Sequence, residues 1–262
     1  MILRLTGVSV RRAGRTILGP IDWQIEAGER WVILGPNGSG KTTLVQVAST
    51  YLWPTTGAVE VLGETISRVD ARELRRQIGY AGADLEAAFD PNLTAIDVVM
   101  TARHAALAPW CHRFTAADRD RAAGLLDEIG AGPVADHEFG TLSTGERRRV
   151  QIARALMPDP DLLILDEPGA SLDLGARETL VRDLGRLAAR PSPRGIVLVT
   201  HHVEEIPPGF GHALVLAAGR AIAAGPIGAS LTAPSLAEAF GLPIGLARTD
   251  GRFRAWLASE PD

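Results

Sequence analysis

The order of apolar and polar side chains in the first third of the chain predicts short strands separated by turns. Residues 2–10 alternate between the two kinds of side chain, and residues 30–34 and 59–62 are further candidate strands. A glycine-rich turn directly follows residue 34. The next segment has no helix breaker before Trp53-Pro54, which predicts a helix that begins near Lys41.

The pattern changes between residues 83 and 152, where alanine and arginine increase and β-branched runs disappear. Two capping boxes, Thr115 with Asp118 and Ser143 with Glu146, each mark the beginning of a helix. After the first box, apolar residues return at helical spacing, namely Ala122, Leu125, Leu126 and Ile129. This segment is therefore predicted to be a helical insert.

Two fully apolar runs farther along the chain end in polar pairs. The first run is followed by Asp166 and Glu167, and the second by Thr200 and His201. Such runs are typical of central strands that are buried on both faces of a parallel sheet. The polar pairs are then expected at the carboxyl edge of that sheet, where open α/β folds bind ligands. The tail from residue 226 onwards is expected to pack on the sheet or on an adjacent helix.

Composition narrows the class of protein. The chain has 262 residues, of which 46% are apolar and 22% charged, so it is expected to be globular with one sizeable core or two small ones. The net charge of -4 provides no global positive field that would attract nucleic acid or anionic lipid. Cys111 is the only cysteine, which excludes an internal disulfide and a cysteine-based zinc cluster and fits a reducing compartment. No apolar run approaches the roughly 18 residues of a membrane-crossing helix, so any membrane role requires a partner.

A phosphate-binding loop is predicted between the strand at residues 30–34 and the helix that follows. The sequence there fits G-x-x-x-x-G-K-[ST], in which successive backbone N–H groups and the helix dipole face one anion. Lys41 is expected to reach the β- and γ-phosphates, and the hydroxyl of Thr42 to ligate Mg²⁺ with Asp166 as the second ligand. The predicted contacts of this loop with the nucleotide are Gly35, Pro36, Asn37, Gly38, Ser39, Gly40, Lys41, Thr42 and Thr43.

Two further residues are candidates for the chemistry of hydrolysis. Glu167 follows the metal-binding Asp166 and is placed to polarise an attacking water, because two adjacent carboxylates at a strand end can divide metal binding from base chemistry. His201 ends the second apolar run, where an imidazole could donate to the γ-phosphate or to the attacking water. Lys41, Glu167 and His201 are therefore the predicted catalytic residues.

Later motifs distinguish this chain from other proteins with a phosphate-binding loop. Leu142-Ser-Thr-Gly-Glu146 and Leu162-Leu-Ile-Leu-Asp-Glu-Pro168 resemble the signature and Walker B motifs of the ABC (ATP-binding cassette) ATPases. Ala170-Ser-Leu-Asp173 resembles the family's D-loop, and His201 its switch histidine, so five motifs stand in the family's order. The resemblance implies a head-to-tail sandwich dimer. In that dimer Ser143 and Gly145 of one protomer contact the γ-phosphate held by the phosphate loop of the other. Glu146 and Asp173 are further predicted nucleotide-binding residues.

The resemblance also implies an α/β fold with a P-loop NTPase core. We expect a mixed, mainly parallel sheet with an N-terminal antiparallel β part, and a helical signature subdomain. The whole chain, residues 1–262, is expected to be one ABC ATPase domain. Its RecA-like core would comprise residues 1–83 and 153–225, its helical subdomain residues 84–152, and its C-terminal extension residues 226–262.

The sequence departs from the family pattern at two positions near the nucleotide. Arg12 stands where the family usually has an aromatic residue that stacks on adenine; a guanidinium plane can also stack on a base, and the alternative is a solvated arginine. No glutamine stands at or near Ala83, where the family's Q-loop residue contacts Mg²⁺ or the attacking water. Asp84 is a candidate oxygen ligand in its place. Arg147, Arg148 and Arg149 behind the signature favour a solvated or interprotomer face over a nucleic-acid patch.

These observations favour the ATP-binding subunit of a transporter, hydrolysing ATP to ADP and phosphate with Mg²⁺. It would act as a homodimer, or paired with a homologous cassette, on separate integral membrane permease subunits. We expect it in the cytoplasm, on the inner face of the membrane. The alternative is a soluble non-transport ABC ATPase that acts on a protein or nucleic-acid assembly, although such relatives generally carry two cassettes. A nucleotide switch with little turnover is a third hypothesis, suggested by the missing glutamine.

Overall fold

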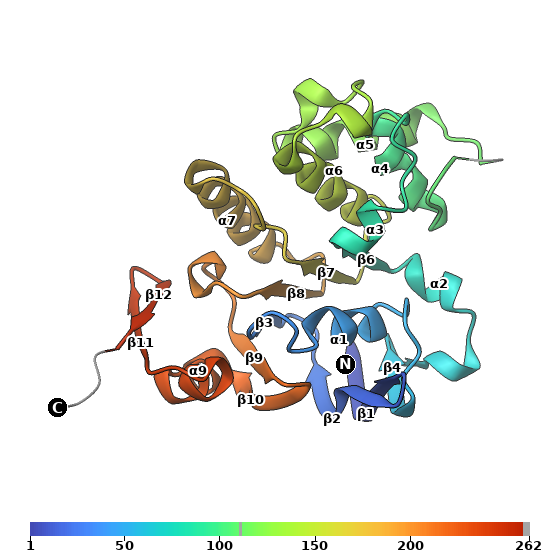
Figure 1. Ribbon diagram of the computed structural model, residues 1–262. Coiled ribbons are helices and arrows are strands. Elements are labelled where there is room, and N and C mark those ends of the chain that lie inside the picture. The colour runs from blue at the N-terminus through green and yellow to red at the C-terminus, as the bar shows by residue number, and fades with distance from the viewer. Residues whose placement is uncertain (110–111, 259–262) are drawn as a thin grey trace.

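A central sheet of six strands positions most of the predicted site (Figure 1). In this computed structural model, which describes residues 1–109 and 112–258, the strand order is β10-β9-β3-β8-β7-β6. The parallel strands are β6 (Ile78–Ala81), β7 (Leu162–Asp166), β8 (Gly195–Thr200), β3 (Arg30–Leu34) and β9 (His212–Ala217), and β10 (Arg220–Pro226) pairs antiparallel with β9. Cys111 lies outside the described residues.

The apolar runs found in the sequence are buried on both faces of this sheet. Along β7, Leu162 and Ile164 belong to one hydrophobic core and Leu163 and Leu165 to the other. Every residue of β3, β7 and β8 is buried. Two cores therefore enclose the sheet, which explains why these strands lack the alternation of a half-exposed strand.

A second, antiparallel sheet is formed mainly by the N-terminal part of the chain. It comprises, in the order β2-β1-β4-β5, the strands β2 (Arg15–Ile25), β1 (Leu3–Arg12), β4 (Thr56–Val61) and β5 (Glu64–Thr65). The strand predicted at residues 2–10 is confirmed and continues to Arg12. The strand predicted at residues 59–62 ends one residue early, because Leu62 has a φ of 54° and begins a turn.

Four hairpins are closed by two-residue turns of one kind. The turns are Ala13-Gly14, Leu62-Gly63, Ala218-Gly219 and Asp250-Gly251, and both residues of each have positive φ. Two-residue turns with positive φ at both positions match the right-handed twist of the paired strands. The last of these turns joins β11 (Ile244–Thr249) to β12 (Arg252–Leu257), which form a separate two-stranded sheet that was not predicted from the sequence.

The helical insert is confirmed, and in Figure 1 it lies beyond the β6 edge of the central sheet. It contains α3 (Ala83–Glu86), α4 (Ala95–Thr101), α5 (Ala116–Glu128) and α6 (Thr144–Leu156). Both predicted capping boxes are present at the beginnings of α5 and α6. Because α6 continues to Leu156 and contacts β6 as well as α4 and α5, the boundary expected after residue 152 falls inside a helix that joins the insert to the sheet.

The remaining helices cover the sheets or link strands. They are α1 (Lys41–Ala48), α2 (Ala71–Arg75), α7 (Leu174–Ala188), α8 (Ile227–Ser230) and α9 (Ala233–Phe240), with short 3-10 turns η1 (Ile66–Arg68), η2 (Ala102–His104), η3 (Gly132–Val134), η4 (Phe139–Thr141) and η5 (Val203–Glu205). The tail packs on the sheet through contacts of α8 and α9 with β9, as expected. Within residues 1–109 and 112–258, no helix has the length and apolar character needed to cross a bilayer.

Candidate nucleotide-binding site

The predicted phosphate loop connects β3 to α1 and has the backbone that the motif requires. Gly40 is the N-cap of α1 with a φ of 99°, and no side chain caps this helix. At Gly35, an added Cβ would collide with the carbonyl oxygen of Leu216 on β9. The first N–H groups of α1 therefore have no side-chain partner at the cap, and the positive end of the helix dipole is available to an anion.

Lys41 is the only lysine of the chain and lies almost completely buried at the start of α1. Its Nζ donates to the carbonyl oxygens of Gly35 at 2.9 Å and Pro36 at 3.1 Å. Glu167 Oε1 is 3.5 Å from the same nitrogen. A single cation is thus held against the loop by two neutral carbonyls and one carboxylate.

An open pocket of about 350 Å³ lies in front of this loop. Of the predicted loop contacts, Asn37, Gly38, Gly40, Lys41, Thr42 and Thr43 line it, together with Glu167. Ile17 also lines it and was not a candidate, because the sequence does not reveal that the β1–β2 hairpin returns this residue to the loop. Arg12 is exposed at the end of β1, opposite Arg15, and does not line the pocket. Ser39 is buried, and Ser39, Gly35 and Pro36 do not line the pocket.

Asp166 is a buried carboxylate at the end of β7. Burial raises its pKa to about 6, and the hydroxyl of Thr42 opposes the shift while the neighbouring carboxylates of Glu167 and Asp84 add to it. Its Oδ1 is buried and has no hydrogen-bond partner among the described residues. An orphaned carboxylate oxygen beside a hydroxyl is a donor set that suits a hard divalent cation, so the residues present fit Mg²⁺.

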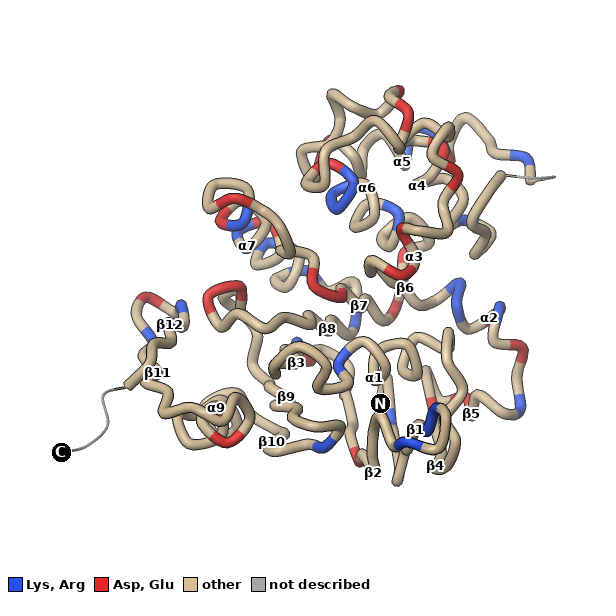
Figure 2. Tube along the Cα trace, in the orientation of Figure 1, with Lys and Arg blue, Asp and Glu red and all other residues tan. Residues whose placement is uncertain are grey.

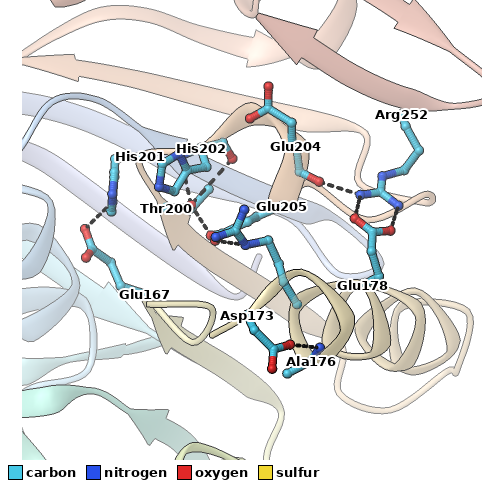
Figure 3. A network of polar contacts seen from close by, with 11 residues as sticks. Glu167, Asp173, Ala176, Glu178, Thr200, His201, His202, Glu204, Glu205 and Arg252 are labelled. Atoms are coloured by element: carbon cyan, nitrogen blue, oxygen red, sulfur yellow. Dashed lines mark hydrogen bonds and ion pairs between the residues drawn. The ribbon is translucent and has the colours of Figure 1, made fainter. Parts of the chain in front are cut away.

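Glu167 and His201 meet in front of Lys41. The backbone of Glu167 has a φ of 50°, an uncommon conformation for a residue other than glycine, and its N–H donates to Val199 on β8 at 3.0 Å. Its Oε1 is 3.3 Å from His201 Nδ1 (Figure 3). Because β3, β8 and β7 are adjacent parallel strands, their carboxyl ends bring the three predicted catalytic residues together.

The signature residues lie at the beginning of α6. Ser143 Oγ donates to Glu146 Oε2 at 2.6 Å and the Ser143 N–H donates to the same oxygen at 2.8 Å. These bonds lower the pKa of Glu146. Gly145 lies against the chain's own Leu172, since an added Cβ would be 3.2 Å from that side chain. Among the described residues, no hydrogen bond or ion pair links Ser143 or Gly145 to the phosphate loop.

Asp173 is likewise engaged within its own element. It is the N-cap of α7 and accepts from the N–H of Ala176 at 2.8 Å (Figure 3). Of the predicted site residues, the structure therefore brings together those of the loop, β7 and β8. Ser143, Gly145, Glu146 and Asp173 form no part of that group within one chain.

Asp84 stands in the segment where the family's glutamine is missing. Its Oδ1 accepts from the Tyr80 hydroxyl at 2.7 Å, and its Oδ2 accepts from Gln46 Nε2 at 2.8 Å. Both carboxylate oxygens thus have neutral donors from β6 and α1. This arrangement favours a structural role for Asp84, which links α3 to the helix that follows the phosphate loop, over a role as an oxygen ligand for a metal.

The basic cluster on α6 is largely paired within the chain. Glu86 on α3 lies 3.1 Å from Arg147 Nε through one oxygen and 3.1 Å from Arg148 Nη1 through the other, and it also accepts from Gln151 at 2.7 Å. Figure 2 shows a basic segment on α6 and an acidic segment on α3. Two of the three arginines therefore lie against a carboxylate of their own chain, whereas the sequence favoured a solvated or interprotomer face.

Comparison with known proteins identifies a family. The profile described as "ABC transporter" matches residues 18–170, which is more than half of the chain. The chain is 41% identical over 245 residues to the ABC transporter ATP-binding protein YlmA of Bacillus subtilis (strain 168), and the match covers 93% of this chain and 92% of that protein. It is 36% identical over 252 residues to the phosphonates import ATP-binding protein PhnC of Bordetella parapertussis, with 91% and 96% covered.

Solved structures agree with this result. A bacterial ABC transporter cassette, determined as a dimer, matches with a TM-score of 0.76 at 25% identity over 86% of this chain and 99% of that one. The non-transport alternative is not favoured by these relatives, which are ATP-binding proteins of transporters. The chain therefore belongs to the ABC transporter family, as one of its ATP-binding and ATP-hydrolysing subunits.

Proposed function

We propose that two copies of the chain close head to tail around two nucleotides, each lending its signature helix to the phosphates bound by the other. The observation that carries this proposal is an incomplete site. Lys41 of the phosphate loop lies beside Glu167, and Glu167 beside His201, whereas Ser143 and Gly145 have no bond to that loop in the part of the chain that the structure describes. A second subunit would supply the missing helix N-terminus to the outer side of the γ-phosphate.

Within each half of the pair, the phosphate loop binds the triphosphate through its N–H groups and Lys41. Thr42 and Asp166 would hold Mg²⁺, which supplies positive charge that offsets the charge of the phosphates. Glu167 then orients the attacking water and takes up its proton, and His201, held near Glu167, contacts the γ-phosphate. Ile17 and Arg12 are the candidates for contact with the base.

Opening and closing of the pair is the mechanical output in this proposal. Hydrolysis removes the shared γ-phosphate contact, so the pair opens and changes the conformation of separate membrane-embedded permease subunits. Import is the direction favoured, because PhnC is named for phosphonate import and a relative from Nocardia farcinica, 34% identical over 250 residues, for hemin import. The subunit would act at the cytoplasmic face of the membrane.

Steady-state ATPase activity of the wild type beside Glu167→Gln tests the proposal. We expect kcat to fall by roughly 100-fold or more, since a general base typically accelerates the reaction by about 10²- to 10⁴-fold. The exposed Glu238→Gln is the matched control and should hydrolyse ATP like the wild type. With ATP and Mg²⁺, the Glu167→Gln variant should elute as a dimer on gel filtration and the Lys41→Ala variant as a monomer.

Two results would contradict the proposal. Equal and slow hydrolysis by the wild type and Glu167→Gln would favour a nucleotide switch with little turnover. Solution scattering that shows a monomer with a non-hydrolysable ATP analogue bound would exclude the shared site.

A further inference from the structure

Arg252 of the C-terminal hairpin connects two elements that follow predicted site residues, since α7 is capped by Asp173 and η5 comes shortly after His201. Its Nη1 and Nη2 donate to the two carboxylate oxygens of Glu178 on α7, at 2.8 and 3.0 Å, and Nη2 also donates to the carbonyl oxygen of Glu204 at 2.7 Å (Figure 3). Glu204 belongs to η5, which begins directly after His201 and His202. One guanidinium therefore spans α7 and the segment that contains His201.

The hairpin is itself fixed to both elements. The N–H of Ala255 donates to Glu204 Oε1 at 3.1 Å, so β12 holds η5 through two separate bonds. Phe253, next to Arg252, is buried in the same core as Val203 of η5 and Leu184 of α7. The backbone next to Arg252 is therefore held in place, so its guanidinium is less mobile than that of an ordinary surface arginine.

A second link, deeper in the molecule, joins the same two elements. Arg177 Nε on α7 is 3.5 Å from Glu205 Oε1 of η5, and Glu205 accepts from the hydroxyl of Thr200, the residue before His201. The N–H of His202 donates to Thr200 Oγ1 at 3.0 Å. Polar contacts thus approach the segment of His201 from two sides, and both contacts begin on α7, the helix capped by Asp173.

Apolar packing covers only part of this segment on its hairpin side, where Val203 and Phe253 share one core. An open cavity of about 280 Å³ separates it from the tail and is lined by His201, His202, Val203 and Glu204 on one side and by residues of α9, β11 and β12 on the other. Pairing of β8 with β7 sets the backbone next to His201, and the polar links that cross to α7 and β12 add to this pairing in fixing the segment that contains His201. The hydrogen bonds between Arg252 and Glu178 lower the pKa of Glu178 and raise the pKa of Arg252.

We propose that Arg252 is a positioning residue for ATP hydrolysis, which sets the place of His201 by tying η5 to α7. The inference rests on the proposed roles of Glu167 and His201. It concerns a part of the chain that lies outside the residues matched by the family profile. The hairpin acts on the rate of the chemical step and not on nucleotide binding, because the phosphate loop makes no bond to it among the described residues.

Arg252→Gln, Glu178→Gln and the double variant test this role against Arg254→Gln, an exposed arginine of the same strand. We expect each single substitution to lower kcat about 5-fold with KM for ATP unchanged, and the double variant to be no worse than either single one. Arg252→Lys should fall between Gln and the wild type, since an ammonium can keep one of the bonds but not the bidentate pair. Arg254→Gln should have the kcat of the wild type.

Two outcomes overturn the inference. Unchanged kcat in Arg252→Gln and Glu178→Gln would show that the link does not reach the reaction. Parallel losses of kcat, nucleotide affinity and melting temperature, without intermediate behaviour of Arg252→Lys, would show a purely structural role. Glu167→Gln, measured in the same series, separates this failure from that of the proposed function, since it should lower kcat by roughly 100-fold or more whether or not Arg252 matters.

Discussion

The two helix N-termini assigned to the phosphates, at α1 and at α6, are prepared for an anion in different ways. At α1 the cap is Gly40, which offers no side-chain acceptor, and a buried Lys41 follows it. At α6 the cap is Ser143, whose hydroxyl and N–H are already bonded to Glu146. One terminus is open and positive, and the other is closed by its own carboxylate.

The difference indicates an order of events. An anion can bind at α1 without displacing any side-chain cap, whereas at α6 it has to replace or approach a carboxylate. Nucleotide binding to one subunit should therefore be strong and largely preformed. Closure of the pair should be the weaker step, sensitive to small changes at Ser143 and Glu146.

The strongest test of the open terminus is Lys41→Ala. We expect it to weaken ATP binding by about 3 kcal/mol, or more than 100-fold, because it removes the one cation within the loop. Equilibrium binding of a fluorescent ATP analogue measures this loss. Binding within about 3-fold of the wild type would mean that the backbone N–H groups alone hold the phosphates.

Asp166→Asn tests the effect of the buried carboxylate close to the start of α1. Because the pKa of Asp166 is raised from its ordinary 3.8 to about 6, the nucleotide-free wild type loses stability as pH rises through this range, and the variant does not. At pH 8 the variant should be more stable by about 2 kcal/mol, and at pH 4 the two should be nearly equal. Urea unfolding at the two pH values measures the difference; a variant less stable at pH 8 would contradict the assignment.

Ser143→Ala tests the closed terminus. In the Glu167→Gln background it should weaken the ATP-bound dimer by about 1.4 kcal/mol, roughly 10-fold, with ATP binding to the monomer unchanged. The matched control is Thr115→Ala, which removes an equivalent capping box from α5. Each variant should lose about 1 kcal/mol of stability because its helix loses the N-cap. If only Ser143→Ala weakens the dimer, the effect comes from the contact between Ser143 and the γ-phosphate.

Glu146→Gln should have the smallest effect. It keeps the capping pattern and removes the negative charge, so the dimer should form at about 2- to 3-fold lower ATP concentration. Since the pKa of Glu146 is lowered from its ordinary 4.5, its carboxylate stabilises the fold above that pH, and the contribution disappears as pH falls through the lowered value. The wild type should exceed the variant in melting temperature at pH 7 and lose this advantage in acid. Asp118→Asn on α5 should lose stability in the same way without changing the dimer.

The parts of the site that could be predicted from the sequence are those fixed by neighbouring residues. The phosphate loop is a strand, a turn and a helix in immediate succession, and the helix begins at Lys41 as predicted. Each capping box depends on two residues three positions apart, so both boxes could be predicted from the sequence. The meeting of Glu167 and His201 followed from a general rule about parallel strands and not from any local pattern.

The rest depends on contacts between distant positions. Asp84 is bonded to Gln46, 38 residues earlier, and Arg252 to Glu178, 74 residues earlier. Nothing near either residue in the sequence indicates its partner. The final hairpin is different, since Asp250-Gly251 is itself a strong local signal for a two-residue turn.

Because the chain has a single lysine, proteolysis at that residue can report whether the phosphate loop is occupied. A lysine-specific protease has a single side-chain target, the bond after Lys41, and this residue is almost completely buried. Cleavage therefore requires local opening of the loop, and bound nucleotide should slow it. Appearance of the fragment that starts at Thr42 would measure occupancy of the loop directly, without labels or mutations.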